Sequence, residues 1–256
     1  MAWVSELLRA IDLFDPEFRQ GIIPAEPADV RELRDVLGLC LPADYSEFLE
    51  VMGAYDGGLL WAERVSTNPR DLIAYCQRQI PLGGALNDPR CVPFGVGADF
   101  DGFGLRLDPG AAHPPVVLLQ GMLPGEEVCQ SLPALLWSHA FLFEQAATGW
   151  VVVSESLESL FTVDKLEAMV ADVGYDRCWF SRPSKRFFRK DDRLLTLHES
   201  KSGTLSAYIG SSERGVIVDA VSELKRSIGN FRDKWMSETT LPEIRRRHFA
   251  SGNGEV

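Results

Sequence analysis

Clustered carboxylates are the first residues of this sequence whose spacing could do chemistry. Asp99 and Asp101 stand two residues apart, and Asp108 follows a short way beyond. Such clusters suit calcium, because hard cations take several carboxylate oxygens as ligands. An EF-hand loop, however, also needs an oxygen ligand at its fifth position and a glutamate at its twelfth, where this chain has Phe103 and Gly110. The Asp-Gly pair at 101–102 therefore favours a hairpin turn over a metal site.

Histidine, serine and glycine form no recognisable catalytic or cofactor-binding motif. His113 lies in an Ala-Ala-His-Pro-Pro loop and His139 on the apolar side of a predicted helix, and neither has a second His or Cys at metal-ligand spacing. The chain has no Gly-x-Ser-x-Gly elbow, and its Gly95-x-Gly97 pair is followed by acidic residues that would repel phosphate. We therefore predict a non-enzymatic protein with no metal and no cofactor.

One segment, residues 177–193, interleaves basic and aromatic side chains. Its members are Arg177, Trp179, Phe180, Arg182, Lys185, Arg186, Phe187, Phe188, Arg189, Lys190 and Arg193. This composition is typical of a surface that binds single-stranded nucleic acid. Asp176, Asp191 and Asp192 dilute the charge, so a twisted hairpin whose aromatic rings are covered by arginine stems is favoured. Docking of the acidic first half of the chain onto this segment is a further alternative.

Charge is divided unequally along the chain. The 256 residues carry a net charge of −11 at pH 7. Residues 1–150 hold nine arginines, no lysine and 21 carboxylates, which gives −12, whereas residues 151–256 hold 17 basic and 16 acidic groups, which gives +1. An acidic first half argues against nucleic acid or an anionic membrane as the partner and permits a basic protein.

Composition and cysteine usage predict a cytoplasmic globular protein. The chain is 45% hydrophobic and 25% charged, which is ordinary for globular domains. It has no run of the ~20 apolar residues that a membrane-spanning helix needs. Glu6 and Asp12 stand where a signal peptide has positive charge before an apolar core. The five cysteines are odd in number and widely separated, as is typical of buried thiols in a reducing compartment.

Apolar periodicity predicts helices and then an antiparallel meander in the first half of the chain. Spacings of three and four predict helices over residues 3–14, 27–38, 43–52, 68–80 and 133–147. A period of two, with turn signals between the runs, predicts strands over residues 91–95, 103–107, 116–120 and 127–131, and a further strand is predicted at 59–62.

The second half predicts a separate, smaller α+β unit. Strands are expected at 151–153, 177–180, 186–190, 193–197 and 204–209, with helices at 162–173 and around Ile217 to Ile228. The chain as a whole is thus predicted to be α+β. Its expected divisions are a first domain at residues 1–150, a small α+β domain at 151–235 and a flexible tail at 236–256.

The order of short motifs in the first half resembles the SUKH superfamily, which includes bacterial toxin-immunity proteins and a fungal regulator of cell-wall glucan synthesis. The motifs are Leu37-Gly38, Leu41-Pro42, Asp44-Tyr45, Phe48-Leu49, Gly57-Gly58, Val92-Pro93-Phe94-Gly95 and the stretch 99–102. They place the resemblance over about residues 20–147. It implies helices packed on an antiparallel sheet in a domain that binds another protein, often a toxin's effector domain, and has no chemistry of its own.

The expected function is therefore that of an immunity protein that binds and neutralises a bacterial toxin, which the acidic charge of the first half predicts to be basic. Its predicted partner contacts are carboxylates around the sheet turns and one aromatic anchor: Asp56, Trp61, Asp99, Asp101, Glu126 and Glu127. Two alternatives remain at this stage. One is an intracellular regulatory adaptor that binds endogenous proteins, and the other is an enzyme of unknown reaction, because a fold does not fix function.

Overall fold

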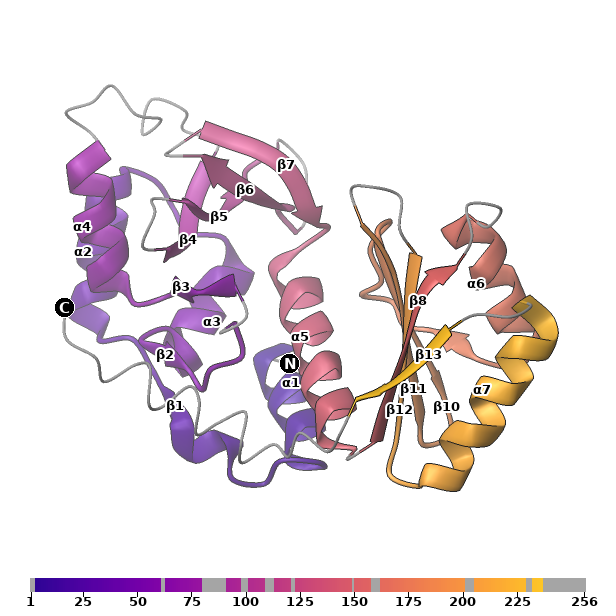
Figure 1. The fold of residues 1–256 in the computed structure, drawn as a ribbon. Helices are drawn as coiled ribbons and strands as arrows, with labels where there is room; N and C mark the ends of the chain where they lie inside the picture. The colour runs from indigo at the N-terminus through magenta and orange to yellow at the C-terminus, as the bar shows by residue number, and fades with distance from the viewer. Residues whose placement is uncertain are drawn as a thin grey trace. The chain divides into compact units, whose positions relative to one another are not determined.

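The chain folds into two compact units, each built from helices and antiparallel sheet, which confirms the predicted α+β class (Figure 1). The computed structural model describes residues 3–60, 63–79, 91–97, 101–108, 113–120, 123–148, 150–157, 162–200, 205–228 and 232–236. The first unit is Met1–Ala140 and the second is Phe141–Val256.

Four helices of the first unit follow the predicted periodicity. They are α1 (Trp3–Asp12), α2 (Pro27–Leu37), α3 (Ala43–Met52) and α4 (Pro69–Gln79), and a short 3-10 helix, η1 (Phe18–Gly21), follows α1. Helix α2 begins at a proline, whose fixed φ suits the first turn. It ends at Gly38, which has a φ of 67° and donates its N–H to the carbonyl of Arg34. That left-handed conformation is why a glycine stands there.

The first unit contains two antiparallel sheets. Strands β1 (Ile22–Ile23) and β2 (Tyr55–Asp56) form a two-stranded sheet. The larger sheet has five strands in chain order: β3 (Val65–Ser66), β4 (Cys91–Gly97), β5 (Asp101–Arg106), β6 (Val116–Gln120) and β7 (Leu123–Cys129). This is the predicted meander, although β7 starts earlier than expected. Residues 59–60 form a turn and not the start of the predicted strand.

Aromatic rings join helix α3 to the five-stranded sheet. Tyr45 of α3 lies 6.2 Å, centroid to centroid, from Phe94 of β4, and Phe94 stacks at 5.8 Å on Phe103 of β5. Tyr45 and Phe94 are fully buried, and such rings dominate the energetics of a core. The motif residues Phe48 and Leu49, which follow Tyr45 on α3, are also fully buried.

The Asp-Gly pair at 101–102 lies inside β5 and not in the predicted turn. Asp101 pairs with Gln120, and Gly102 pairs with Val96. An irregularity in the register of β4 brings the two backbones so close that a Cβ on Gly102 would lie 2.2 Å from the carbonyl oxygen of Gly95. The glycine is therefore required for close approach of two strands. Residues 98–100 lie outside the described residues.

Helix α5 (Leu132–Ala147) contains the division between the two units. Its buried apolar residues surround the helix, which is typical of a helix in a protein interior. They are Leu132, Ala134, Leu135, Leu136, Ala140, Phe141 and Phe143. The units divide between Ala140 and Phe141, and not after Trp150 as predicted, because the last turns of α5 pack on the sheet of the second unit.

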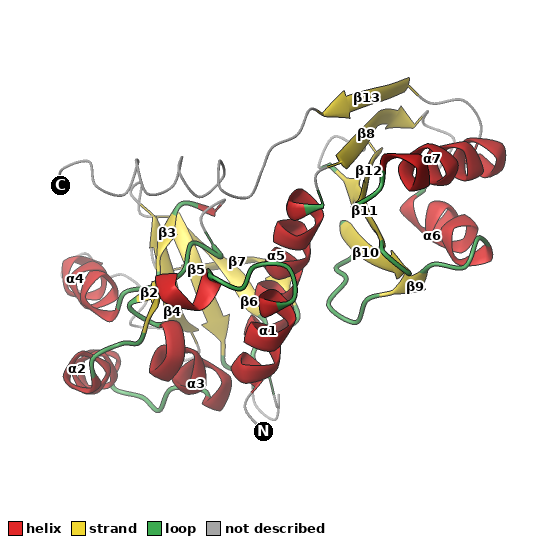
Figure 2. Cartoon of the chain, turned by 90° about the horizontal axis from the view of Figure 1, so that it is seen from below, coloured by secondary structure: helices red, strands yellow, loops and turns green. Residues whose placement is uncertain are grey.

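The second unit has one antiparallel sheet of six strands in the order β13-β8-β12-β11-β10-β9. The strands are β8 (Trp150–Leu157), β9 (Asp176–Arg177), β10 (Lys185–Lys190), β11 (Arg193–Glu199), β12 (Leu205–Ser211) and β13 (Arg232–Met236). Helices α6 (Val163–Asp172) and α7 (Arg214–Ile228) lie on one face of this sheet (Figure 2). Strand β13 was not predicted, and residues 237–256 of the predicted tail lie outside the described residues.

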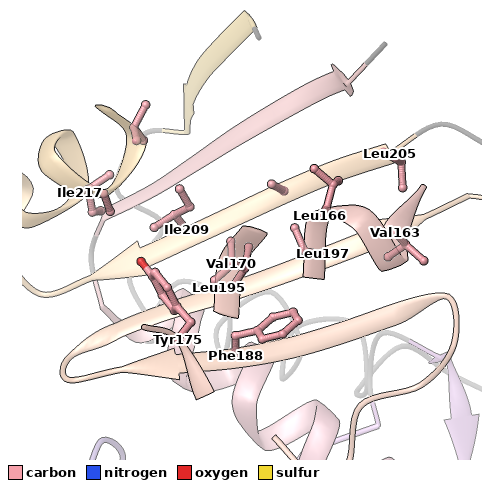
Figure 3. Packing of buried hydrophobic residues seen from close by; sticks show 13 residues of the cluster. Val163, Leu166, Val170, Tyr175, Phe188, Leu195, Leu197, Leu205, Ile209 and Ile217 are labelled. Atoms are coloured by element: carbon pink, nitrogen blue, oxygen red, sulfur yellow. The ribbon is translucent and has the colours of Figure 1, made fainter. Parts of the chain in front are cut away.

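The two faces of this sheet bury different sets of side chains, because successive residues of a strand point to opposite sides. Under α6 and α7 lies a core of 13 buried residues that includes Leu166, Phe188 and Leu195 (Figure 3). On the other face, Phe187 of β10 packs 5.2 Å from Phe141 of α5, centroid to centroid. The sheet is thus covered by α6 and α7 on one face and by the end of α5 on the other.

Helix α5 also makes a buried polar contact with this sheet. The side-chain nitrogen of Gln145 donates to the carbonyls of Leu194 and Tyr208, and its oxygen accepts from the hydroxyl of Thr196. A Cβ on Gly210 of β12 would lie 2.8 Å from the Gln145 side chain, so glycine there makes room for the helix.

No helix in the described part of the chain is long and apolar enough to cross a membrane.

The five cysteines are thiols, and none forms a disulfide. Cys76, Cys91 and Cys129 are buried as predicted, Cys178 is half-buried and Cys40 is exposed. Burial raises the pKa of Cys76 to about 11, which keeps this thiol protonated and unreactive at neutral pH.

Candidate functional site

Of the six predicted partner contacts, the four that the structure describes lie on three different strands of the first unit. Trp61 and Asp99 lie outside the described residues. Asp56 is on β2 of the small sheet, whereas Asp101 begins β5 and the pair Glu126 and Glu127 lies on β7 of the five-stranded sheet. Asp101 pairs with Gln120, the last residue of β6. Glu127 pairs with Val117, near the start of β6, so Asp101 and Glu127 lie toward opposite ends of that strand.

The carboxylate of Asp56, one of the predicted partner contacts, is buried and organises a turn inside the first unit. Asp56 is only 6% exposed. Its Oδ1 accepts the N–H of Gly58 and its Oδ2 accepts the N–H of Leu60, each at 2.9 Å. Burial raises the pKa of Asp56, and these backbone hydrogen bonds oppose that rise. Gly57 and Gly58, at φ 70° and 81°, give the turn its left-handed backbone.

Two histidines of the first unit lie beside carboxylates. His139 is 3% exposed, and its Nε2 lies 3.3 Å from Glu63 Oε1 without hydrogen-bond geometry. His113 is exposed, and its Nδ1 lies 2.5 Å from Asp44 Oδ2 at the start of α3. Within the described residues, no group of three or more His, Cys, Asp or Glu side chains could hold a metal ion.

An acidic edge borders the five-stranded sheet of the first unit. We define it as Arg106, Asp108, Glu126 and Glu127. The Nε of Arg106 lies 2.9 Å from Asp108 Oδ2, and its second terminal nitrogen lies 3.2 Å from Glu127 Oε2. Both contacts raise the pKa of Arg106 and hold it protonated, with the hydrogen bond to Asp108 contributing most. Two carboxylates contact this guanidinium, and Glu126 stands next to Glu127 on β7, so the four residues of the acidic edge carry a net negative charge.

The backbone beneath the acidic edge is an outer strand of the sheet. Strand β7 pairs with β6 and is last in the strand order, and residues 125–127 are exposed. Register shifts between β6 and β7, together with Pro124, make its edge irregular, which protects a sheet from unspecific pairing. Outer strands and complementary charge are common means of protein recognition.

Three of the four aromatic rings of the basic segment are buried, which does not favour a platform for stacking nucleic-acid bases. Phe187 and Phe188 are fully buried on opposite faces of the second sheet, and Phe180 is 6% exposed. Arg189 lies over the ring of Phe141 at 5.8 Å. This is the favoured hairpin arrangement, in which arginine stems cover buried rings.

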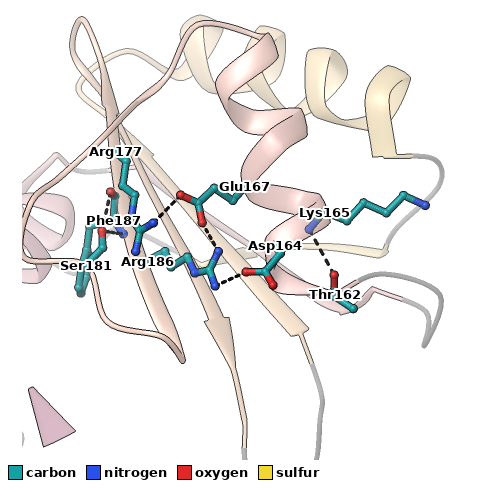
Figure 4. A network of polar contacts seen from close by, with 8 residues as sticks. All are labelled: Thr162, Asp164, Lys165, Glu167, Arg177, Ser181, Arg186 and Phe187. Carbon is teal, nitrogen blue, oxygen red and sulfur yellow. Dashed lines mark hydrogen bonds and ion pairs between the residues drawn. The ribbon is translucent and has the colours of Figure 1, made fainter.

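Carboxylates of the second unit neutralise most of the same segment. Arg186 contacts both Asp164 and Glu167 of α6, and Arg177 lies 2.8 Å from Glu167 (Figure 4). Arg189 pairs with Glu144 of α5 at 2.5 Å. Lys190 and Arg193 lie 3.7 and 3.5 Å from Glu223 of α7. These cations therefore fix helices to the sheet and are not available to a row of phosphates.

Sequence reasoning did not find Arg106 as part of the acidic edge. Arg106 and Asp108 lie two residues apart, which could have suggested a local pair. The contact with Glu127 depends on the pairing of β5, β6 and β7, and the register shifts between β6 and β7 hide this alignment in the sequence. The chain matches no protein-family model, and a search of curated proteins also finds no match.

Proposed function

We propose that this protein is a non-enzymatic immunity protein, which binds and blocks a basic toxin effector domain through its first unit. The distribution of charge between the two units carries the proposal. Residues 1–140 hold nine arginines, no lysine and 20 carboxylates, a net charge of −11. Residues 141–256 hold 17 basic and 17 acidic groups, a net charge of zero. The net negative charge of the protein thus arises entirely from one compact unit.

The resemblance of the first unit to the SUKH superfamily supports a protein partner, and the acidic edge on β7 supplies its contact surface. An acidic surface attracts a basic partner over a Debye length of ~10 Å and so increases the association rate at low salt. Mutating rim charges of this kind mainly changes the association rate and its dependence on salt. In the proposed complex, the second unit enlarges or orients the interface.

The proposal is tested by measuring association with toxin-domain proteins encoded beside the gene of this chain. We expect one of them to form a stoichiometric complex whose association slows as salt rises. Glu126→Lys combined with Glu127→Lys should slow association about tenfold at low salt, since steering can change association rates by 10- to 1,000-fold. Asp99→Lys with Asp101→Lys tests the other predicted carboxylates of this sheet in the same way.

The matched control is Glu32→Lys combined with Asp35→Lys, which makes the same change of net charge on exposed positions of α2. It should slow association much less than the β7 variant. An equal effect of both variants, or an association rate that ignores salt, would contradict binding through the acidic edge. Recovery of several endogenous proteins and no toxin would replace the immunity function with that of a regulatory adaptor.

A further inference from the structure

A buried histidine of the first unit lies within electrostatic reach of two carboxylates. His139 is on α5, just before the division at Ala140, and is only 3% exposed. Its Nε2 lies 3.3 Å from Glu63 Oε1 and is among the buried polar atoms that make no hydrogen bond with the described residues. Such an atom destabilises a fold, so a role for it has to be sought in its surroundings.

Both carboxylates belong to the segment 56–63. Asp56 is buried, and burial raises its pKa, whereas the charge of His139 acts to lower that pKa. An interaction between two charges is reciprocal, so the Asp56 carboxylate favours the charged form of His139. The side chain of Glu63 is 34% exposed, and the next residue, Arg64, is exposed. The segment thus brings negative charge to a buried imidazole ring.

The protonation state of His139 decides what its Nε2 can do toward Glu63. A neutral imidazole carries a proton on one ring nitrogen only, whereas the imidazolium donates from both. The charged ring can therefore donate from Nε2 to Glu63 Oε1 while it attracts both carboxylates. Burial opposes the charge on the ring, and the two carboxylates offset the loss of hydration.

We propose that His139 and Glu63 form a proton-operated latch, which closes in mild acid and fastens the segment 56–63 to α5. This segment contains the turn organised by Asp56 and the buried Leu60, and it leads into β3, an outer strand of the five-stranded sheet. The attraction exists only while His139 is charged. It therefore stabilises the first unit at low pH and is lost as pH rises through the titration of the ring. The latch does not rest on the proposed toxin binding, because it uses no residue of the acidic edge.

The test compares urea unfolding of the full chain and of Glu63→Gln at about pH 5.5 and about pH 8, followed through the NMR amide signals of α3. Histidine normally gains its proton between these values, whereas glutamate normally stays charged. Glu63→Gln should raise the unfolding constant about threefold more at the lower pH, as expected for a partly exposed ion pair. In a His139→Gln background, the effect of Glu63→Gln should be the same at both pH values. An effect that is equal at both pH values in the wild-type background overturns the proposal.

An NMR titration of the His139 ring gives a second measurement, which does not require a variant of the buried histidine. The ring should become charged between about pH 8 and about pH 5.5. In Glu63→Gln the midpoint should move to lower pH by about half a unit, which is the same threefold effect. A ring that stays neutral down to about pH 5, or a midpoint that does not move, also overturns the latch.

His113→Gln is the matched control, since it removes the other histidine of the first unit that lies beside a carboxylate. His113 is exposed, and its Nδ1 lies 2.5 Å from Asp44 Oδ2. This variant should leave unchanged both the pH dependence of the Glu63→Gln effect and the titration of the His139 ring. If His113→Gln abolishes that pH dependence, the exposed pair is responsible for it and the latch is overturned.

Discussion

At the scale of single residues, Asp56 shows how burial changes the role of a carboxylate. In the sequence it is one acidic residue beside a Gly-Gly turn, whereas in the fold it is 6% exposed and accepts backbone N–H groups from that turn. The carboxylate residues Glu126 and Glu127 on β7 are exposed instead. Residue type predicted a negative charge at each of these positions, and burial decided which of the carboxylates lie at the surface.

The raised pKa of Asp56 predicts how stability responds to pH. A group whose pKa is higher in the folded state stabilises the fold fully below its unfolded pKa, here about 3.8, and that contribution is lost as pH rises through the folded pKa. Asp56→Asn removes this titration. We therefore expect the free energy of unfolding of the wild type to fall relative to that of Asp56→Asn as pH rises from about 4, measured by urea unfolding. Parallel pH profiles for the two proteins would contradict a raised pKa.

At the scale of elements, α5 is held on the second sheet by one buried amide as well as by aromatic packing. Gln145 is 4% exposed and Thr196, which donates to it, is 1% exposed. No apolar pattern predicts a glutamine at such a position. It becomes intelligible only when the helix lies across β11 and β12, where a buried polar group needs partners.

Replacing Gln145 with an apolar residue should therefore lower the free energy of unfolding, although an apolar side chain normally suits a buried position. Gln145→Leu leaves the hydroxyl of buried Thr196 without its acceptor, and we expect a loss of about 2 kcal/mol in the free energy of unfolding. Thr196→Val removes the hydroxyl that Gln145→Leu leaves unpaired. The loss in free energy of unfolding caused by Thr196→Val should therefore be smaller in the Gln145→Leu variant than in the wild type. Chemical unfolding of the two single variants and the double variant gives this coupling energy. Additive losses would show that the hydrogen bond has no net effect.

At the scale of the whole molecule, packing sets the boundary between the units, and local signals in the sequence do not. The sequence places it after Trp150, where the charge balance changes and a new strand begins. The structure places it between Ala140 and Phe141, because Phe141 and Gln145 belong to the interior of the second unit.

Two shortened chains distinguish these boundaries. A chain of residues 138–236 should unfold cooperatively, whereas residues 150–236 should not fold, because Phe187 and Thr196 lose their cover. Loss of a buried phenylalanine costs about 3–5 kcal/mol, which approaches the total stability of a small domain. Circular dichroism during heating, together with amide hydrogen exchange, measures the difference. A cooperative transition of residues 150–236 would support the boundary after Trp150.

The sequence by itself determined the α+β class, the positions of most helices and the meander of the first unit. It could do so because apolar spacing, prolines and glycines act locally, as at Pro27 and Gly38 of α2. It also determined the unequal charge of the two halves, which is additive along the chain. These properties need no knowledge of which segments meet.

Only the tertiary structure decided which polar groups meet and which are buried. Arg106 reaches Glu127 through the register of three strands, and Gln145 finds Thr196 across a helix-to-sheet contact. The basic segment was interpreted correctly as a hairpin, yet its carboxylate partners on α5, α6 and α7 lie up to 45 residues away in the chain. Such contacts depend on packing between distant elements, which local periodicity does not encode.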